Sequence, residues 1–160
     1  MLHQEVLTEA AQKLFPILSK FKGTFYLAGG TALALQLGHR ISVDFDLFSP
    51  DPIKKTLLSA VEEAYDGVPV EVLVNNSREL TLIVGSVKHT FLHYPFPLVL
   101  PLVQNGTIDL LSAQELLATK AYTIGRRGTF KDYIDLYTGV HEKISSLTCI
   151  YPRAWESCAS

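Results

Sequence analysis

The segment from Thr24 to Ser49 constrains the fold more than any other part of the chain. It reads TFYLAGGTALALQLGHRISVDFDLFS. The apolar run over 24–28 predicts a buried strand, the glycine pair predicts a turn, and a helix is expected over 31–37 with Thr31 as its cap. Polar and apolar residues then alternate over 40–48, which predicts a half-buried strand. A strand, a helix and a returning strand in this order favour a mixed α/β fold.

The rest of the chain continues the alternation of helices and strands. Helical periodicity is expected over 4–20, 53–65, 113–125 and 130–143, and strands over 68–74, 79–85 and 87–93. The proline-rich run 95–101 predicts an extended connector, because proline cannot donate to a sheet ladder. We therefore expect one α/β (α+β) domain over 1–160, with its core over 20–140. Its mixed sheet has about four to five strands, flanked by helices and followed by a C-terminal helical pair.

Composition excludes several classes of protein. The 160 residues are 48% hydrophobic and 19% charged, which is unlike a disordered chain, and a net charge of −2 gives no global attraction to nucleic acid. No apolar run reaches the ~18 residues of a membrane span and no secretory leader is evident, so a cytoplasmic protein without membrane contact is expected. Cys149 and Cys158 form neither a disulfide framework nor a zinc motif.

Asp44 and Asp46 are the first candidates for chemistry. On a strand they point to one side together with Arg40 and Ser42, while apolar residues face the other side. Two adjacent carboxylates repel unless a cation offsets their charge, and a hard divalent ion such as Mg²⁺ or Mn²⁺ fits them. The alternative is a solvated strand face without a ligand.

The glycine pair is the second candidate. Gly29, Gly30 and Thr31 stand where a helix begins, and backbone N–H groups at a helix N-terminus can bind phosphate. Thr31 would add a hydroxyl donor. The alternative is that glycine serves only the conformational freedom of the turn.

Charged residues on the C-terminal helices complete the set. Lys120 lies within an apolar helical stripe, either as a snorkelling side chain or as a cation held near the site. Asp132 fits the first turn of a helix by its charge alone, and Asp135 is expected to pair with Lys120 or an arginine. The local basic cluster is either a phosphate or RNA contact or a solvated loop, and it comprises Arg126, Arg127 and Lys131.

Two motifs of the chain, GGTALAL…HRISVDFDLF and KAYTIGRRGTFKDYIDLY, resemble those of the AbiEii/AbiGii-type toxin nucleotidyltransferases. The resemblance covers roughly residues 20–140. It implies a polymerase-β-like minimal nucleotidyltransferase fold and Mg-dependent transfer of a nucleoside monophosphate from an NTP to a hydroxyl of RNA (tRNA included) or protein. It also implies the toxin component of a toxin–antitoxin or abortive-infection system, with a cognate antitoxin as partner.

The resemblance also implies roles for single residues. Asp44 and Asp46 would bind magnesium and be catalytic, and Lys120 and Asp135 match catalytic lysine and aspartate motifs. Asp132 matches the lysine–aspartate pair. The residues implied in nucleotide binding are Gly29, Gly30, Thr31, Arg40, Ser42 and Lys120.

The chain departs from the family pattern in one respect. The predicted strand over 87–93 carries Lys88, His89 and Thr90 where a third carboxylate is expected, and Glu71 lies on a neighbouring strand. The chain is also expected to be short in its C-terminal helical portion. A non-catalytic nucleotide- or partner-binding domain of the same fold is therefore the alternative function.

A third hypothesis is a metal phosphohydrolase. It would use His39, His89 and His93 as metal ligands, although their spacing matches no strong motif.

Overall fold

A computed structural model describes residues 2–144 of the protein, with the backbone alone at positions 126 and 127. Cys149 and Cys158, for which no disulfide or zinc role is predicted, lie outside the described residues. Within those residues, the helices are too short or too polar for a membrane crossing.

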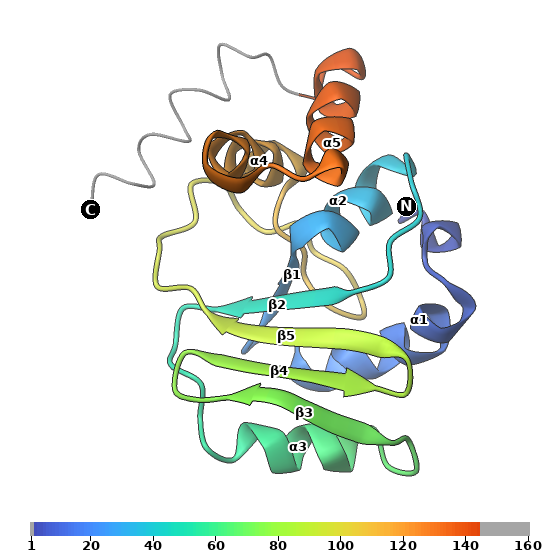
Figure 1. The fold of residues 1–160 in the computed structure, drawn as a ribbon, viewed down its shortest axis with the longest axis vertical. Coiled ribbons are helices and arrows are strands. Elements are labelled where there is room, and N and C mark those ends of the chain that lie inside the picture. Colours follow the sequence, from blue (N-terminus) through green and yellow to red (C-terminus); the bar gives the residue numbers. More distant parts are fainter. Residues whose placement is uncertain (1, 145–160) are drawn as a thin grey trace.

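The centre of the molecule is a five-stranded sheet with the order β1-β2-β5-β4-β3 (Figure 1). The strands are β1 (Tyr26–Ala28), β2 (Phe45–Ser49), β3 (Val70–Asn75), β4 (Glu79–Val84) and β5 (Val87–His93). β2 and β5 run parallel and the other neighbours antiparallel, so the predicted mixed sheet is confirmed. β2 is thereby placed between β1 and β5, so neighbouring strands support the Asp46 side chain from both sides.

Helices surround the sheet unevenly. The N-terminal region comprises η1 (Gln4–Val6), α1 (Glu9–Leu14) and η2 (Phe15–Phe21) rather than the single helix expected over 4–20. α3 (Leu57–Ala64) lies at the β3 end of the sheet. α2 (Gly29–Leu37) packs against α4 (Ala113–Arg127) and α5 (Phe130–His141) beside the β1–β2 end, which confirms the C-terminal helical pair (Figure 1).

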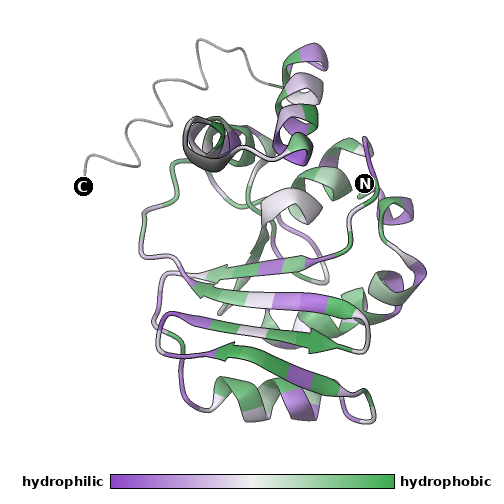
Figure 2. Cartoon of the chain, in the orientation of Figure 1, coloured by the Kyte–Doolittle hydropathy of each residue, from purple (hydrophilic) through white to green (hydrophobic). Residues whose placement is uncertain are grey.

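The core is continuous between the sheet and its helices, as the hydropathy of the strands indicates (Figure 2). Phe45, Leu47 and Phe91 are fully buried at the β2–β5 pair. His89 is buried beside them, where its Nδ1–H donates to the Val87 carbonyl and its Nε2 accepts from the Tyr65 hydroxyl. Burial of this much apolar surface anchors β2 firmly in the sheet.

The strand predicted over 40–48 is wrong in its first half. β2 begins at Phe45, and Ile41 and Val43 are 58% and 39% exposed rather than buried. The physical reason is pairing: β5 meets β2 from Phe45 onward, whereas the preceding segment makes only a single bridge, between Ser42 and Leu7. Residues 38–44 therefore cross over the start of α2 without belonging to the sheet.

The connector between β5 and α4 has no helix or strand over 95–101 and bends at positions 96, 99 and 100, and α4 holds it in place. The Glu115 carboxylate accepts from the backbone N–H groups of Val99 and Leu100 at 3.0 and 3.1 Å. Ser112 caps α4 by accepting from the N–H of Glu115. The Glu115 side chain therefore contacts the connector and does not return to the backbone N–H of Ser112, as it would in a capping box.

Candidate active site

The turn between β1 and α2 needs glycine for two separate reasons. Gly29 has φ +67°, and a Cβ added to it would lie 2.1 Å from Oδ2 of Asp46. Ala28 is the register partner of Asp46, so the Asp46 side chain leans directly over the turn. Gly29 therefore provides a conformation that L side chains rarely adopt, and it also provides the space in which an aspartate carboxylate lies.

Gly30 is close to a second charged side chain. A Cβ added to Gly30 would lie 2.4 Å from one terminal nitrogen of Arg40. The guanidinium consequently lies against the first turn of α2, where the first backbone N–H groups of a helix have no intrahelical partner. Both glycines thus bring a charged group close to a helix N-terminus.

Thr31 of α2 holds in place the acidic segment, residues 42–46, which carries Asp44 and Asp46. Its hydroxyl donates to the backbone carbonyl of Asp44 and lies 2.7 Å from the Ser42 hydroxyl. The prediction that Thr31 caps the helix is wrong, because α2 begins at Gly29 and its N-cap is Ala28. The buried hydroxyl instead holds residues 42–44 in place, since no neighbouring strand pairs with them as β5 pairs with β2.

The carboxylates of Asp44 and Asp46 make no hydrogen bond or ion pair with any residue between 2 and 144. Burial raises the pKa of Asp46, and the neighbouring Asp44 adds to this; Lys88 and Lys120 act in the opposite direction. An acceptor-only pair with one raised pKa is stabilised by a cation placed between the two groups. The donor set, two carboxylates with free oxygens, fits a hard divalent ion.

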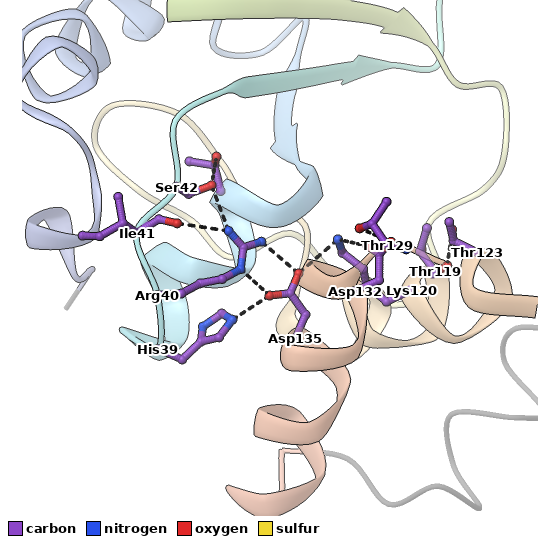
Figure 3. A network of polar contacts seen from close by, with 11 residues as sticks. His39, Arg40, Ile41, Ser42, Thr119, Lys120, Thr123, Thr129, Asp132 and Asp135 are labelled. Atoms are coloured by element: carbon purple, nitrogen blue, oxygen red, sulfur yellow. Dashed lines mark hydrogen bonds and ion pairs between the residues drawn. The ribbon is translucent and has the colours of Figure 1, made fainter. Parts of the chain in front are cut away.

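Asp135 joins α5 to the segment after α2 (Figure 3). Its fully buried carboxylate accepts from Nε2 of His39 at 2.7 Å and from Nε of Arg40 at 2.6 Å. The other oxygen accepts from Arg40 at 3.0 Å and lies 3.0 Å from Nζ of Lys120. Burial alone would raise the pKa of Asp135, but the hydrogen bonds from His39, Arg40 and Lys120 outweigh it and hold the pKa well below its ordinary range.

Asp132 holds Lys120 from the other side. Its Oδ1 lies 2.5 Å from Nζ of Lys120, and its Oδ2 accepts from the backbone N–H and the hydroxyl of Thr129, which completes a capping box at the start of α5. The ammonium group of Lys120 is therefore fixed between Asp132 and Asp135 (Figure 3). The geometry distinguishes this arrangement from simple snorkelling, since two carboxylates hold the ammonium group.

These groups surround a polar cavity of about 130 Å³. Its wall contains the predicted Gly30, Thr31, Arg40, Ser42, Asp44, Asp46 and Lys120, together with Val43, Thr129, Lys131 and Asp132. Asp135 is not on this wall, because it lies behind Arg40 and Lys120. A second, more apolar cavity of about 350 Å³ shares Lys120, Thr129 and Asp132 with the first and also contains Gly29, Phe48 and Leu116. A larger cavity of about 440 Å³ lies away from the acidic pair, between η2 and α3.

Sequence reasoning missed Thr129 and gave His39 a different role, that of a metal ligand. Thr129 is signalled only by its position three residues before Asp132, the spacing of a capping box. His39 hydrogen-bonds Asp135, and nothing in its sequence context indicates this partner, which is 96 positions away.

The histidines proposed as metal ligands do not converge. His39 contacts Asp135, His89 is enclosed with Tyr65 in the core, and His93 contacts the carbonyl of Pro50. Over residues 2–144 there is no cluster of three His, Cys, Asp or Glu side chains suited to a metal ion. The phosphohydrolase hypothesis therefore loses its ligand set.

The β5 position beside the acidic pair carries no carboxylate. Thr90 is the register partner of Asp46, and Lys88 lies two residues before it on the same side of the strand. Glu71 belongs to β3, which is separated from β2 by β5 and β4. β5 therefore places Thr90 and Lys88, and no carboxylate, beside Asp46. Glu71 does not converge on the pair.

Solved structures share this fold, a putative nucleotidyltransferase of Helicobacter pylori among them, with a TM-score of 0.64 at 19% identity over 85% of this chain and 70% of that one. The chain superposes on JHP933 of Helicobacter pylori with a TM-score of 0.68 at 19% identity, covering 86% of this chain and 68% of that one. It superposes on ANT(2″)-Ia, solved in complex with adenylyl-2″-tobramycin, with a TM-score of 0.63 at 13% identity, covering 92% and 97% of the two chains. The architecture is thus the polymerase-β-like nucleotidyltransferase fold.

Sequence comparison narrows the class to a family. The sequence model of the family described as nucleotidyl transferase AbiEii toxin, type IV toxin–antitoxin system, matches residues 14–102. An uncharacterised protein of Aquifex aeolicus is 34% identical over 116 residues, which cover 71% of this chain and 56% of that protein. The chain belongs to the AbiEii nucleotidyl transferase family, and it spans about half the length of this relative.

Proposed function

We propose that the protein is a metal-dependent nucleotidyltransferase that moves a nucleoside monophosphate from an NTP to an acceptor hydroxyl. The observation that carries this proposal is the unpaired carboxylate pair Asp44 and Asp46, which faces the N-terminus of α2 across a glycine turn. Carboxylates for a metal and backbone donors for phosphate in one cavity are the parts that phosphoryl and nucleotidyl transfer requires.

The charges of the polar cavity suit a metal-bound triphosphate. Asp44 and Asp46 would hold Mg²⁺ or Mn²⁺, which when bound supplies positive charge to the phosphate oxygens. The backbone of Gly29 and Gly30 and the cations Arg40 and Lys120 would face the same oxygens. The Thr31 hydroxyl already donates its hydrogen bond to the Asp44 carbonyl, so we assign Thr31 and Ser42 to positioning the acidic segment.

The second cavity suits the nucleoside. It adjoins the polar cavity at Lys120 and Thr129, and the ring of Phe48 offers an apolar face for a base. The hydroxyls of Thr119 and Thr123 already donate to helix carbonyls, so they offer acceptor oxygens to a base.

The proposed reaction forms one bond and breaks one bond. The acceptor oxygen bonds to the α-phosphorus, the bond from that phosphorus to the bridging oxygen of the β-phosphate breaks, and pyrophosphate leaves. The acceptor proton passes to solvent. Lys120 and Arg40 stabilise the negative charge that develops on the phosphate oxygens, and because buried carboxylates already hold them they need little reorganisation.

The first test is the paired substitution Asp44→Asn and Asp46→Asn. We expect the folded variant to lose incorporation of labelled NTP into RNA or protein of a cell extract supplied with Mg²⁺, because the metal ligands are removed. The control is Glu62→Gln with Asp66→Asn, two exposed acidic residues at the α3 end. Undiminished incorporation by the Asp44/Asp46 variant would contradict the proposal.

A second function has one observation in its favour. Lys88 and Thr90 of β5 stand beside Asp46 where a further carboxylate would otherwise complete a larger metal site. A nucleotide-binding domain without turnover would bind Mg-NTP in a calorimeter and label no acceptor. Detection of a labelled acceptor in the extract experiment excludes this alternative.

The biological setting follows from the family. We propose that the protein acts in the cytoplasm as the toxin component of a type IV toxin–antitoxin or abortive-infection system, with RNA (tRNA included) or protein as acceptor. A cognate antitoxin would relieve growth arrest caused by the active protein, which co-expression in bacteria measures.

A further inference from the structure

α5 presents an exposed face composed of rings. Phe130, Tyr133 and Tyr137 are 80%, 55% and 70% exposed. They recur at intervals of three and four residues, so they share one side of the helix, and His141 continues the row with its ring stacked on Tyr137 at 5.7 Å. The opposite side of α5 carries Asp132, Asp135 and Gly139, which are buried against α4 and α2. The row therefore points directly away from the core.

The row begins at the candidate active site. Phe130 lies between Thr129 and Lys131, and both of these neighbours line the polar cavity. A molecule lying along the row would therefore extend to the edge of the cavity that we assign to the triphosphate. The acceptor has to approach this cavity from outside, which makes the row a continuation of the site.

The charge of this face selects among occupants. The exposed positions of α5 are Phe130, Lys131, Tyr133, Tyr137 and His141, so they comprise four rings and one lysine. The nearest exposed carboxylate is that of Glu142 just after the helix, and it lies 3.4 Å from Nδ1 of His141 at the far end of the row. The two aspartates of α5 are turned inward and held by Lys120 and its neighbours. Rings together with a cation are the combination that binds unpaired nucleotides, whose bases stack and whose phosphates are negative.

We propose that the exposed face of α5 binds unpaired nucleotides at the end of an RNA acceptor and directs that end into the active site. This proposal rests on the proposed function and names the part of the surface that takes the acceptor. From Phe130 to His141 the row spans about 16 Å along the helix. At about 3.4 Å per stacked base, this length accommodates on the order of four nucleotides.

The test measures binding of a fluorescent, unstructured RNA of about eight nucleotides to the full chain by anisotropy. For the paired substitution Tyr133→Ala and Tyr137→Ala we expect at least about tenfold weaker binding, since base stacking on an aromatic ring contributes about 1–3 kcal/mol per base. Tyr133→Phe with Tyr137→Phe should retain the affinity, because the rings remain. Val72→Ala with Leu73→Ala, exposed apolar residues on the distant β3, should also retain it.

Three results would overturn the proposal. They are equal RNA affinity of the alanine variant and the native chain, equal affinity for an RNA duplex of the same length, and displacement of the RNA by an acidic peptide at equal concentration, which would indicate a protein partner. Calorimetry with Mg-NTP separates this proposal from the proposed function. The alanine variant should bind NTP normally. If instead the native chain binds RNA but not NTP, the RNA-binding role of α5 stands and the proposed nucleotidyl transfer is contradicted.

Discussion

At the scale of single residues, the site depends on close approaches that only particular side chains allow. The Asp44–Asp46 spacing and the glycine pair were recognisable in the sequence, because residue type and interval carry their chemistry. The partner of the Thr31 hydroxyl was not recognisable, since it is a backbone carbonyl 13 positions away. Every residue has a backbone carbonyl, so a side chain that donates to one has no complementary side chain elsewhere in the sequence that would reveal the contact.

Gly29 provides a sharp test at this scale. In Gly29→Ala the new Cβ would displace the Asp46 carboxylate, so we expect Mg-NTP affinity to fall by at least tenfold, about 1.4 kcal/mol. Gly67→Ala is the matched control, because Gly67 has φ +79° and no atom within 4 Å of its added Cβ. Both variants bear a left-handed strain of about 1–2 kcal/mol in urea unfolding. Equal Mg-NTP affinity in the two variants would contradict the assigned role of Gly29.

At the scale of elements, hydrophobic periodicity predicted a strand correctly where that strand has a pairing partner close to it in sequence. The hairpin strands β3, β4 and β5 lie close to their predicted positions, because each has a neighbour in sequence to pair with. Residues 40–44 alternate as regularly as a strand, yet they pair with no strand, and alternation alone carries no information about a partner. The parallel pairing of β2 with β5 likewise depends on segments some 40 residues apart.

The attachment of α5 is the element-scale prediction. Asp135→Asn leaves Arg40, Lys120 and His39 facing a neutral group, and breaking a buried ion pair costs about 3–5 kcal/mol in free energy of unfolding. Asp109→Asn is the control: it breaks the partly exposed pair with Lys22, whose loss should cost no more than about 1 kcal/mol. Urea denaturation at pH 7 measures both.

The pH dependence of this attachment has a definite sign. The pKa of Asp135 lies below its ordinary range in the folded state, so its stabilisation is complete above about pH 4 and is lost as the pH falls further. The Asp135→Asn variant should therefore lose less stability than the native chain on acidification below this pH. An identical acid dependence of the two proteins would show that Asp135 is not held by its cations.

At the scale of the whole molecule, the sheet order brings the C-terminal helices to the β1–β2 edge, where the acidic pair lies. Fold class, the mixed sheet and the helical pair could be predicted, since they follow from long periodic segments. The order β1-β2-β5-β4-β3 could not, because it depends on which hydrophobic faces pack best in three dimensions. The same packing encloses His89 in the centre of the core.

His89 gives the whole molecule a measurable acid sensitivity. Burial lowers its pKa from 6.5 to about 4, so the folded state favours the neutral ring. Its contribution to stability is therefore complete above pH 6.5 and declines as the pH falls toward 4, by up to about 3 kcal/mol. Urea unfolding of the native chain and of His89→Gln between pH 7 and 4 should differ in slope over this window. Parallel curves would exclude the buried ring as the cause.

The contacts of Asp135 have a consequence for the order in which the protein is made. A ribosome releases the N-terminal part first, so the acidic pair and the glycine turn are present before α5 exists. Until Asp132 and Asp135 arrive, Arg40 and Lys120 have no carboxylates to hold them, and the positive side of the cavity has no fixed shape. A nascent chain would thus carry the proposed metal ligands before the cations of the cavity are held in place.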